Sequence, residues 1–168
     1  MLAAAPSCPV QVVGKRIVDA GGRTVFTDPG YQAIAHEIRC SGRAVWVMFH
    51  GGAASSQEAY VLVRSGDRGR TWSVVAAERY FGVKAPHELD AYSGPWTIVG
   101  ERKAYLTGSC PACGRGTVSL WVTLDGGRSF RRYAAPALTG YFAKLLSVRV
   151  AGGVVTIVAR GRTATVHA

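Results

Sequence analysis

Two carboxylates, Glu88 and Asp90, have the residue type and spacing that acid–base chemistry requires. They lie two positions apart in a connection between predicted strands, and alternation places both on one side of an extended segment. Cleavage of a glycosidic bond needs two carboxyl groups roughly 5–10 Å apart, one of them with a raised pKa. Glu88 and Asp90 are therefore the first catalytic candidates, and Glu37 and Glu58 are further acids outside the evident turns. The alternative is a solvated loop whose acids pair with surplus arginines.

Three histidines, His36, His50 and His87, supply nitrogen atoms of the kind that bind metal ions, and Glu37 and Glu88 adjoin two of them in the sequence. Their spacing matches no local ligand pattern, and His36 alternates with polar neighbours as an ordinary strand residue does. We predict neither a metal site nor another cofactor.

The four cysteines form an even set, which is typical of an oxidising compartment. Three pairings are possible, and we favour Cys8 with Cys40 and Cys110 with Cys113. The last pair has the spacing of a redox motif, but it lies between two predicted strands, whereas a redox pair lies at the start of a helix. It also supplies only half of a four-cysteine zinc site. A disulfide that closes a hairpin loop is the favoured interpretation.

Four arginines, Arg68, Arg70, Arg128 and Arg131, gather around two predicted turns. The chain has 20 Lys and Arg against 10 Asp and Glu, a formal net charge of +10 and a pI near 10.0. This balance favours contact with anionic polymers, among which we favour acidic glycans and wall polymers over nucleic acid. The alternatives are that the arginines are solvated turn residues and that the positive charge keeps an exported protein in solution.

The two turns that carry these arginines share one pattern. In each, an aspartate can accept hydrogen bonds from the following backbone N–H groups, a glycine tolerates positive φ, and a hydroxyl residue adds a second acceptor. Each follows a β-rich run, which predicts a turn between the last two strands of a sheet, with an aromatic residue packed beneath it. The pattern is Ser65, Asp67, Gly69, Thr71 and Trp72 in the first motif (residues 65–72), and Thr123, Asp125, Gly127, Ser129 and Phe130 in the second motif (residues 123–130).

This pattern resembles the Asp-box, S-x-D-x-G-x-T-W, of bacterial neuraminidase repeats (BNR), which occurs in sialidases and other Asp-box β-propellers. The first motif matches every defined position, and the second has three conservative replacements. The resemblance implies a propeller-like array of antiparallel sheets in which the aspartates have a structural role. It does not carry over the sialidase catalytic residues, since the segment Arg16-Ile17-Val18 lacks the proline of the family's Arg-Ile-Pro signature.

Residues 11–168 are expected to form a single all-β domain, because no stretch shows the 3.6-residue apolar period over a helix length. Strand and turn signals recur in three units of four strands, at approximately 31–80, 86–135 and 143–168. The last unit is one strand short, and we expect residues 11–18 to complete it. Propellers typically have four to eight blades, so we expect a partial propeller that is either a fragment or completed by an oligomer.

Residues 1–10 are predicted to be the remnant of an export leader and an N-terminal tail, because residues 1–6 resemble the small-residue end of a secretory signal. No apolar run reaches the roughly 18–20 residues of a membrane helix. Together with the even number of cysteines, this predicts a secreted, extracellular or periplasmic protein without a membrane span.

The sequence therefore predicts an exported module that binds or scaffolds, with glycans or other anionic polymers as its partners and without turnover of its own. Aromatic residues near the starts of the units are suited to stacking on sugar rings, namely Tyr92, Trp96, Tyr141 and Phe142. One alternative is a sialidase-like glycoside hydrolase whose site is incomplete in this chain. Another is a scaffold for the assembly of protein partners.

Overall fold

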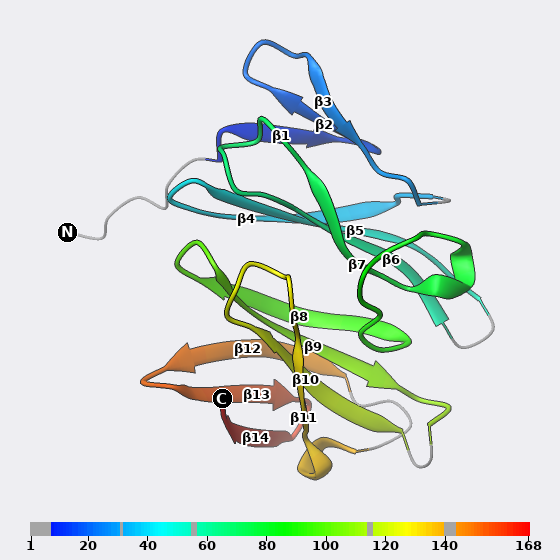
Figure 1. The fold of residues 1–168 in the computed structure, drawn as a ribbon. Helices are drawn as coiled ribbons and strands as arrows, with labels where there is room; N and C mark the ends of the chain where they lie inside the picture. Colours follow the sequence, from blue (N-terminus) through cyan, green and yellow to red (C-terminus); the bar gives the residue numbers. More distant parts are fainter. Residues whose placement is uncertain (1–7, 31, 55–56, 114–115, 140–143) are drawn as a thin grey trace.

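The computed structural model describes residues 8–30, 32–54, 57–113, 116–139 and 144–168 (Figure 1). Most of the predicted leader, and with it Tyr141 and Phe142, lies outside the described residues. The regular elements of the described part are β-strands and two short 3-10 turns, η1 (Arg79–Phe81) and η2 (Pro136–Leu138). The prediction of an all-β class is confirmed.

The strands form four antiparallel sheets, none of which closes on itself. Sheet 1 contains β1 (Val10–Val13), β2 (Arg16–Asp19) and β3 (Thr24–Thr27). Sheet 2 contains β4 (Ala35–Ser41), β5 (Ala44–Ala54), β6 (Gln57–Ser65) and β7 (Ser73–Ala77). Sheet 3 contains β8 (Tyr92–Val99), β9 (Lys103–Cys110), β10 (Thr117–Thr123) and β11 (Arg131–Ala134). Sheet 4 contains β12 (Leu145–Ala151), β13 (Val154–Ala159) and β14 (Arg162–His167).

Sheets 2, 3 and 4 fall within the three predicted repeats, but the expected role of residues 11–18 is wrong. These residues form a hairpin in which Gln11 pairs with Val18, and β3 joins them as the third strand of sheet 1. Among the described residues, sheet 4 consequently has three strands and no partner from residues 11–18. The physical reason is the tight turn at Gly14, whose positive φ of 59° reverses the chain within the segment that we expected to be one strand.

The central sheets are covered on both faces, which explains their nearly continuous apolar strands. In β5 every residue from Ala44 to Phe49 is buried. Side chains alternate along a strand, so Trp46 and Met48 face one neighbouring sheet while Val47 and Phe49 face the other. The four sheets therefore follow one another in chain order, from sheet 1 at the top of Figure 1 to sheet 4 at the bottom.

Three separate apolar layers hold this row together, one between each pair of consecutive sheets. Sheets 1 and 2 bury Val10, Ile17, Val47, Phe49, Val61 and Val63. Sheets 2 and 3 bury Trp46, Met48, Leu62, Trp96 and Leu106. Sheets 3 and 4, with η2, bury Leu120, Leu138, Val148, Val155 and Ile157.

The first motif connects β6 to β7 as a turn built around the carboxylate of Asp67. Oδ1 of Asp67 accepts hydrogen bonds from the Ser65 hydroxyl at 2.7 Å and from the Thr71 backbone N–H at 2.9 Å, and Oδ2 accepts from the Thr71 hydroxyl at 2.7 Å. The Gly69 N–H donates to the Ser65 Oγ at 2.8 Å, and the Trp72 indole donates back to the Gly69 carbonyl. The three polar residues of the pattern, Ser65, Asp67 and Thr71, thus all take part in the turn.

The second motif connects β10 to β11 with the same bonds to its aspartate, and Phe130 replaces Trp72 without an indole N–H to donate. Asp125 accepts from the hydroxyls of Thr123 and Ser129 at 2.9 and 2.6 Å and from the Ser129 backbone N–H at 3.0 Å. The correspondence extends to the backbone, because Arg68 and the equivalent Gly126 both have positive φ, at 63° and 81°. The two motifs therefore form equivalent hairpin turns in consecutive sheets, as the sequence predicts.

Each motif also packs its glycine against the preceding sheet. A Cβ at Gly69 would lie 2.5 Å from a methyl group of Val10 in sheet 1, and a Cβ at Gly127 would lie 2.4 Å from a methyl group of Val75 in sheet 2. Since φ is also +86° at both positions, no other residue fits without displacing the neighbouring sheet. Each motif turn thus closes a hairpin in its own sheet and also contacts the preceding sheet.

Both predicted disulfides are present. Cys8 is bonded to Cys40, which ties the segment before β1 to β4 of sheet 2. Cys110 is bonded to Cys113 and closes the connection that follows β9. The structure has no free cysteine among its described residues.

Replacing Asp67 by Ala removes the acceptor shared by the hydroxyls and N–H groups of the first motif. We expect the free energy of unfolding to fall by about 1–3 kcal/mol, the usual result of leaving such donors without a partner. Urea unfolding followed by circular dichroism measures the change. Arg70→Ala is the matched control, because the Arg70 backbone N–H that donates to Asp67 is kept. Equal stabilities for the two variants would contradict the role given to the aspartate.

Candidate functional site

The predicted arginines lie in the motif turns or, for Arg131, at the start of the strand that follows one, at one end of the row of sheets. Arg68, Arg70, Arg128 and Arg131 are all exposed. Each motif turn is bonded to the other turn of its sheet at this end. The Arg68 N–H donates to the Arg43 carbonyl in the turn between β4 and β5, and the Gly126 N–H donates to the Arg102 carbonyl in the turn between β8 and β9, both at 2.8 Å. The motif turns, the other turns of sheets 2 and 3 at this end and the turn between β2 and β3 carry exposed cations. We call these cations the basic turn surface, which comprises Arg23, Arg43, Arg68, Arg70, Arg102, Lys103, Arg128 and Arg131.

The basic turn surface is continuous across sheets 2 and 3. Glu101, in the turn between β8 and β9, accepts a bond of 2.7 Å from the Arg43 backbone N–H, and its carbonyl accepts one of 3.1 Å from Arg64. Sheet 1 reaches the same end. Gly69 of the first motif packs on Val10 of β1, and Val10 pairs with Asp19 of β2, which adjoins the turn that carries Arg23. The cations therefore extend over three consecutive sheets.

The acids at this end are occupied by the turns themselves. Hydrogen bonds from the hydroxyl and N–H of Thr71 hold the pKa of Asp67 far below its ordinary value, and those from Ser129 do the same for Asp125. Asp19 accepts two backbone N–H bonds within its own turn, from Gly21 and Arg23. The Arg23 side chain also pairs with Asp19 at 3.2 Å. The carboxylates of Asp67 and Asp125 thus accept bonds within their turns while Arg68, Arg70, Arg128 and Arg131 remain exposed, so the outer surface presents positive charge.

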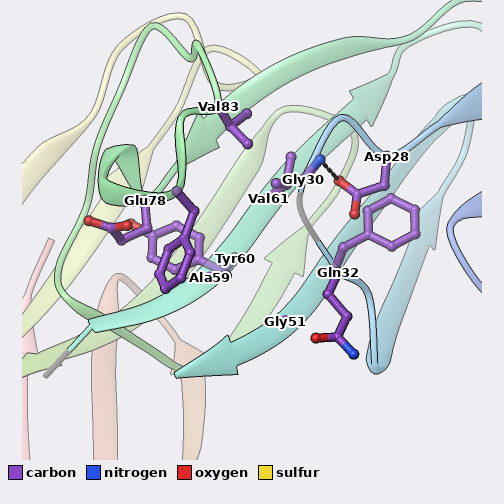
Figure 2. Close-up of a pocket in the computed structure, with 11 residues that line it drawn as sticks. Asp28, Gly30, Gln32, Gly51, Ala59, Tyr60, Val61, Glu78 and Val83 are labelled. Carbon is purple, nitrogen blue, oxygen red and sulfur yellow. Dashed lines mark hydrogen bonds between the residues drawn. The ribbon is translucent and has the colours of Figure 1, made fainter. Parts of the chain in front are cut away.

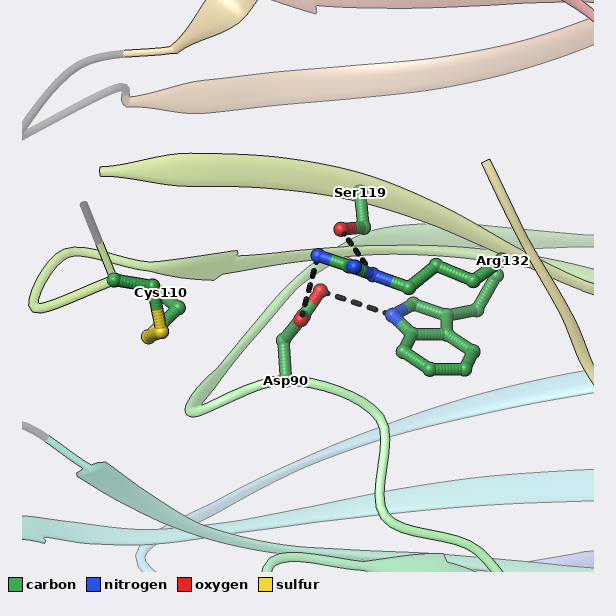
Figure 3. Close-up of a disulfide and its surroundings, with 6 residues drawn as sticks. Asp90, Cys110, Ser119 and Arg132 are labelled. Carbon is green, nitrogen blue, oxygen red and sulfur yellow. Dashed lines mark hydrogen bonds and ion pairs between the residues drawn. A yellow bond between two sulfur atoms is a disulfide. The ribbon is translucent and has the colours of Figure 1, made fainter. Parts of the chain in front are cut away.

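The two catalytic candidates of the sequence, Glu88 and Asp90, have different surroundings. Trp121 donates a hydrogen bond of 2.9 Å to the Asp90 carboxylate. Figure 3 shows the same carboxylate directed at the guanidinium of Arg132, which lies 3.9 Å away. Only 8% of the Asp90 side chain is exposed, and burial raises its pKa against the lowering effects of these two partners. Glu88 is exposed. Asp90 therefore contacts β10 through Trp121 and β11 through Arg132.

Two other acids, Asp28 and Glu78, lie in the interior, with 3% and 1% of their surfaces exposed. They line one small cavity next to Tyr60 (Figure 2). Burial raises the pKa of both carboxyls, and Asp28 accepts a bond of 2.9 Å from the Gly30 N–H. The free space of about 10 Å³ holds at most one water molecule. These acids cannot reach a substrate through it.

A second polar cluster, which sequence reasoning did not assemble, lies where β4, β8 and β12 approach one another. These strands are each at the edge of their sheet. Residues of all three, with His50 of β5 and Glu58 of β6, line a hollow of about 470 Å³ that we call the inner hollow. A volume of this size is in the range of ligand sites.

A chain of hydrogen bonds runs along the wall of the inner hollow. Arg39 donates to Glu37 Oε2 at 2.7 Å, and Glu37 Oε1 lies 3.2 Å from His50 Nε2. On the other side of the ring, His50 Nδ1 lies 3.0 Å from Glu58 Oε1. The Ser93 hydroxyl and backbone N–H both donate to Glu58 Oε2, at 2.8 and 3.0 Å. The chain joins sheet 2 to sheet 3.

The two glutamates keep His50 protonated. Burial alone lowers the pKa of His50, but the hydrogen bonds and charges of Glu37 and Glu58 outweigh it and raise the pKa to about 9. The same bond to His50 lowers the pKa of Glu37. At neutral pH the ring is therefore an imidazolium that donates on both sides. It cannot act as the general base for Ser93, although their atoms lie 3.2 Å apart.

The sequence named Glu37, Glu58 and His50, but only as separate residues. Their partnership depends on the pairing of β4 with β5 and of β5 with β6, which places Glu37 and Glu58 on either side of His50. Of the predicted stacking residues, Trp96 is only 3% exposed and its ring is covered by Arg39 at 4.9 Å, while Tyr92 is half-buried. Trp96 therefore belongs to the core.

Within the described ranges, no group of three or more His, Cys, Asp and Glu side chains is placed to hold a metal ion. The search for long apolar helices in the same residues finds none that would cross a membrane. A scan against protein-family models, a search of curated proteins and a search of solved structures each find no match to this chain. The resemblance to Asp-box proteins therefore stays a prediction from the two motifs.

Raising the pH through about 9 is expected to weaken the fold by deprotonating His50. The pKa of His50 is about 9 in the folded protein and about 6.5 in the unfolded chain. Its contribution is therefore complete below pH 6.5 and is lost as the pH rises through 9. Urea unfolding between pH 6 and 10 should show this decline in the wild type, relative to a flatter profile for His50→Gln. The exposed His36→Gln is the control, and a His50→Gln profile parallel to the wild type would disprove the assignment.

Proposed function

We propose that this protein is an exported binding module of the Asp-box type that attaches to acidic glycans or other anionic polymers through the basic turn surface. The observation that carries the proposal is the separation of charge within the turns. The aspartates point inward to backbone and hydroxyl donors, and Arg68, Arg70, Arg128 and Arg131 remain exposed.

The composition of the surface suits anionic groups on a polymer. Most of its cations are arginines, whose planar guanidinium groups form paired hydrogen bonds with carboxylate, sulfate-like and phosphate groups. The cations are carried by turns whose backbones are fixed by several hydrogen bonds each, so little order has to be gained on binding. Their distribution over three sheets favours an extended ligand over a small one.

The arrangement of acids favours binding over glycoside hydrolysis. Asp90 is bonded to Trp121 and faces Arg132. Glu37 has a lowered pKa and is paired with Arg39 and His50, which is the opposite of what a general acid requires. We therefore keep the hydrolase as the weaker alternative.

For the architecture, we propose a partial β-propeller. The support is the succession of antiparallel sheets in chain order, the equivalent turns in sheets 2 and 3, and the meeting of the edge strands β4, β8 and β12 around one hollow. In a propeller the first strands of the blades face the central channel in this way. Sheets 1 and 4 each leave one face without a neighbouring sheet among the described residues, and further blades or a second copy would cover them. The two disulfides support export to an oxidising compartment.

Replacing Arg68, Arg70, Arg128 and Arg131 by Ser should weaken binding to a sulfated polysaccharide such as heparin by at least about tenfold, a loss of about 1.4 kcal/mol. Wild-type affinity should also fall steeply with added salt, because exposed charges are screened. Calorimetric titration measures both.

The matched control removes four exposed cations outside the basic turn surface, Arg16, Lys84, Arg149 and Arg160, and so causes the same change in net charge. If the two quadruple variants lose affinity equally, net charge alone explains binding. The proposed surface would then be rejected.

A further inference from the structure

We infer that the inner hollow is a second binding site, specific for an uncharged polyhydroxylated ligand such as a neutral sugar unit. This inference is independent of the basic turn surface. It rests on the hollow of about 470 Å³ and on the polar groups of Glu37, Arg39, His50, Glu58 and Ser93 that line it.

The site is built before any ligand arrives. Its polar side chains come from β4, β5, β6 and β8, and each is held by a neighbour through the hydrogen bonds of the chain from Arg39 to Ser93. His50 and Glu58 are each only 16% exposed, so they are fixed groups of the wall. A ligand that fits this wall gains hydrogen bonds without ordering flexible side chains.

The charges of the wall already balance one another, which selects against a charged ligand. Arg39 is paired with Glu37, and the His50 ring lies between Glu37 and Glu58. Two cations thus face two carboxylates. A ligand with a net charge would have to break one of these pairs and leave a half-buried partner without compensation, at a high free-energy cost. A neutral ligand meets no such penalty.

The wall nevertheless keeps hydrogen-bonding capacity that hydroxyl groups can use. Each carboxylate oxygen accepts more than one bond, and a guanidinium carries five N–H donors, of which Arg39 directs bonds to Ile38 and Glu37. The Ser93 hydroxyl donates to Glu58 and keeps its acceptor lone pairs. The edge strands β4, β8 and β12 add backbone groups that point away from their neighbours in the sheet. Sugar hydroxyls, which both donate and accept, match this mixture.

Strand β12 supplies apolar surface to the hollow. Leu146 of β12 is 52% exposed at the hollow, beside Val148. The C–H faces of a sugar ring pack against such side chains while its hydroxyls face the polar wall. A lining that combines apolar side chains with a few fixed polar groups is the usual composition of a small-molecule site.

The test is calorimetric titration of the whole chain at high salt with four neutral trisaccharides: maltotriose, cellotriose, mannotriose and triacetylchitotriose. At least one should bind saturably with a Kd in the millimolar range or below. Leu146→Arg, which fills the hollow from an exposed position, and Glu58→Gln, which removes one charge from the balanced wall, should each weaken that binding at least tenfold.

Val13→Arg is the control, because Val13 is a similarly exposed apolar strand residue of sheet 1. This variant should bind the sugar like the wild type, and circular dichroism verifies the fold of every variant. Failure of all four sugars to bind would overturn the inference. So would equal affinities for Leu146→Arg and Val13→Arg. Since the probes are neutral and the salt is high, neither result depends on the basic turn surface.

Discussion

The carboxylate at the centre of each motif turn is the interaction on which the rest of this structure depends. Asp67 and Asp125 each accept hydrogen bonds from the hydroxyl and backbone donors of their own turn. The fixed turn then places a glycine at positive φ directly against the preceding sheet. The hydrogen bonds within one turn thereby fix both the last hairpin of a sheet and the contact of that sheet with the preceding one.

The same device determines where the charges of the protein face. Because the aspartates are turned inward, the arginines beside them are left at the surface, and consecutive sheets repeat this arrangement at one end of the row. In the inner hollow, by contrast, the cations are paired with carboxylates. Arg39, Glu37, His50 and Glu58 are paired with one another, so this wall is polar but balanced. These two arrangements support our proposals of a surface that binds polyanions and a hollow that binds neutral ligands.

The sequence predicted the features that depend on short-range patterns. The all-β class, the two motif turns and both disulfides follow from alternating strands, local acceptors and cysteine spacing. It did not predict that residues 11–18 fold back at Gly14, because a single glycine inside a β-prone run does not distinguish one strand from a hairpin. It also missed the meeting of Glu37, His50, Glu58 and Ser93, which come from four strands and are joined only by strand register and sheet stacking.

The central claim, that the motif turns present the polymer-binding surface, is tested most directly by mapping the contact itself. Backbone amide chemical shifts of the labelled protein would be recorded during titration with a sulfated hexasaccharide. Our account predicts that the largest changes lie in residues 42–44, 65–72, 100–103 and 123–131. Largest changes at Glu37, His50 and Ser93 instead, with the motif turns unaffected, would contradict it.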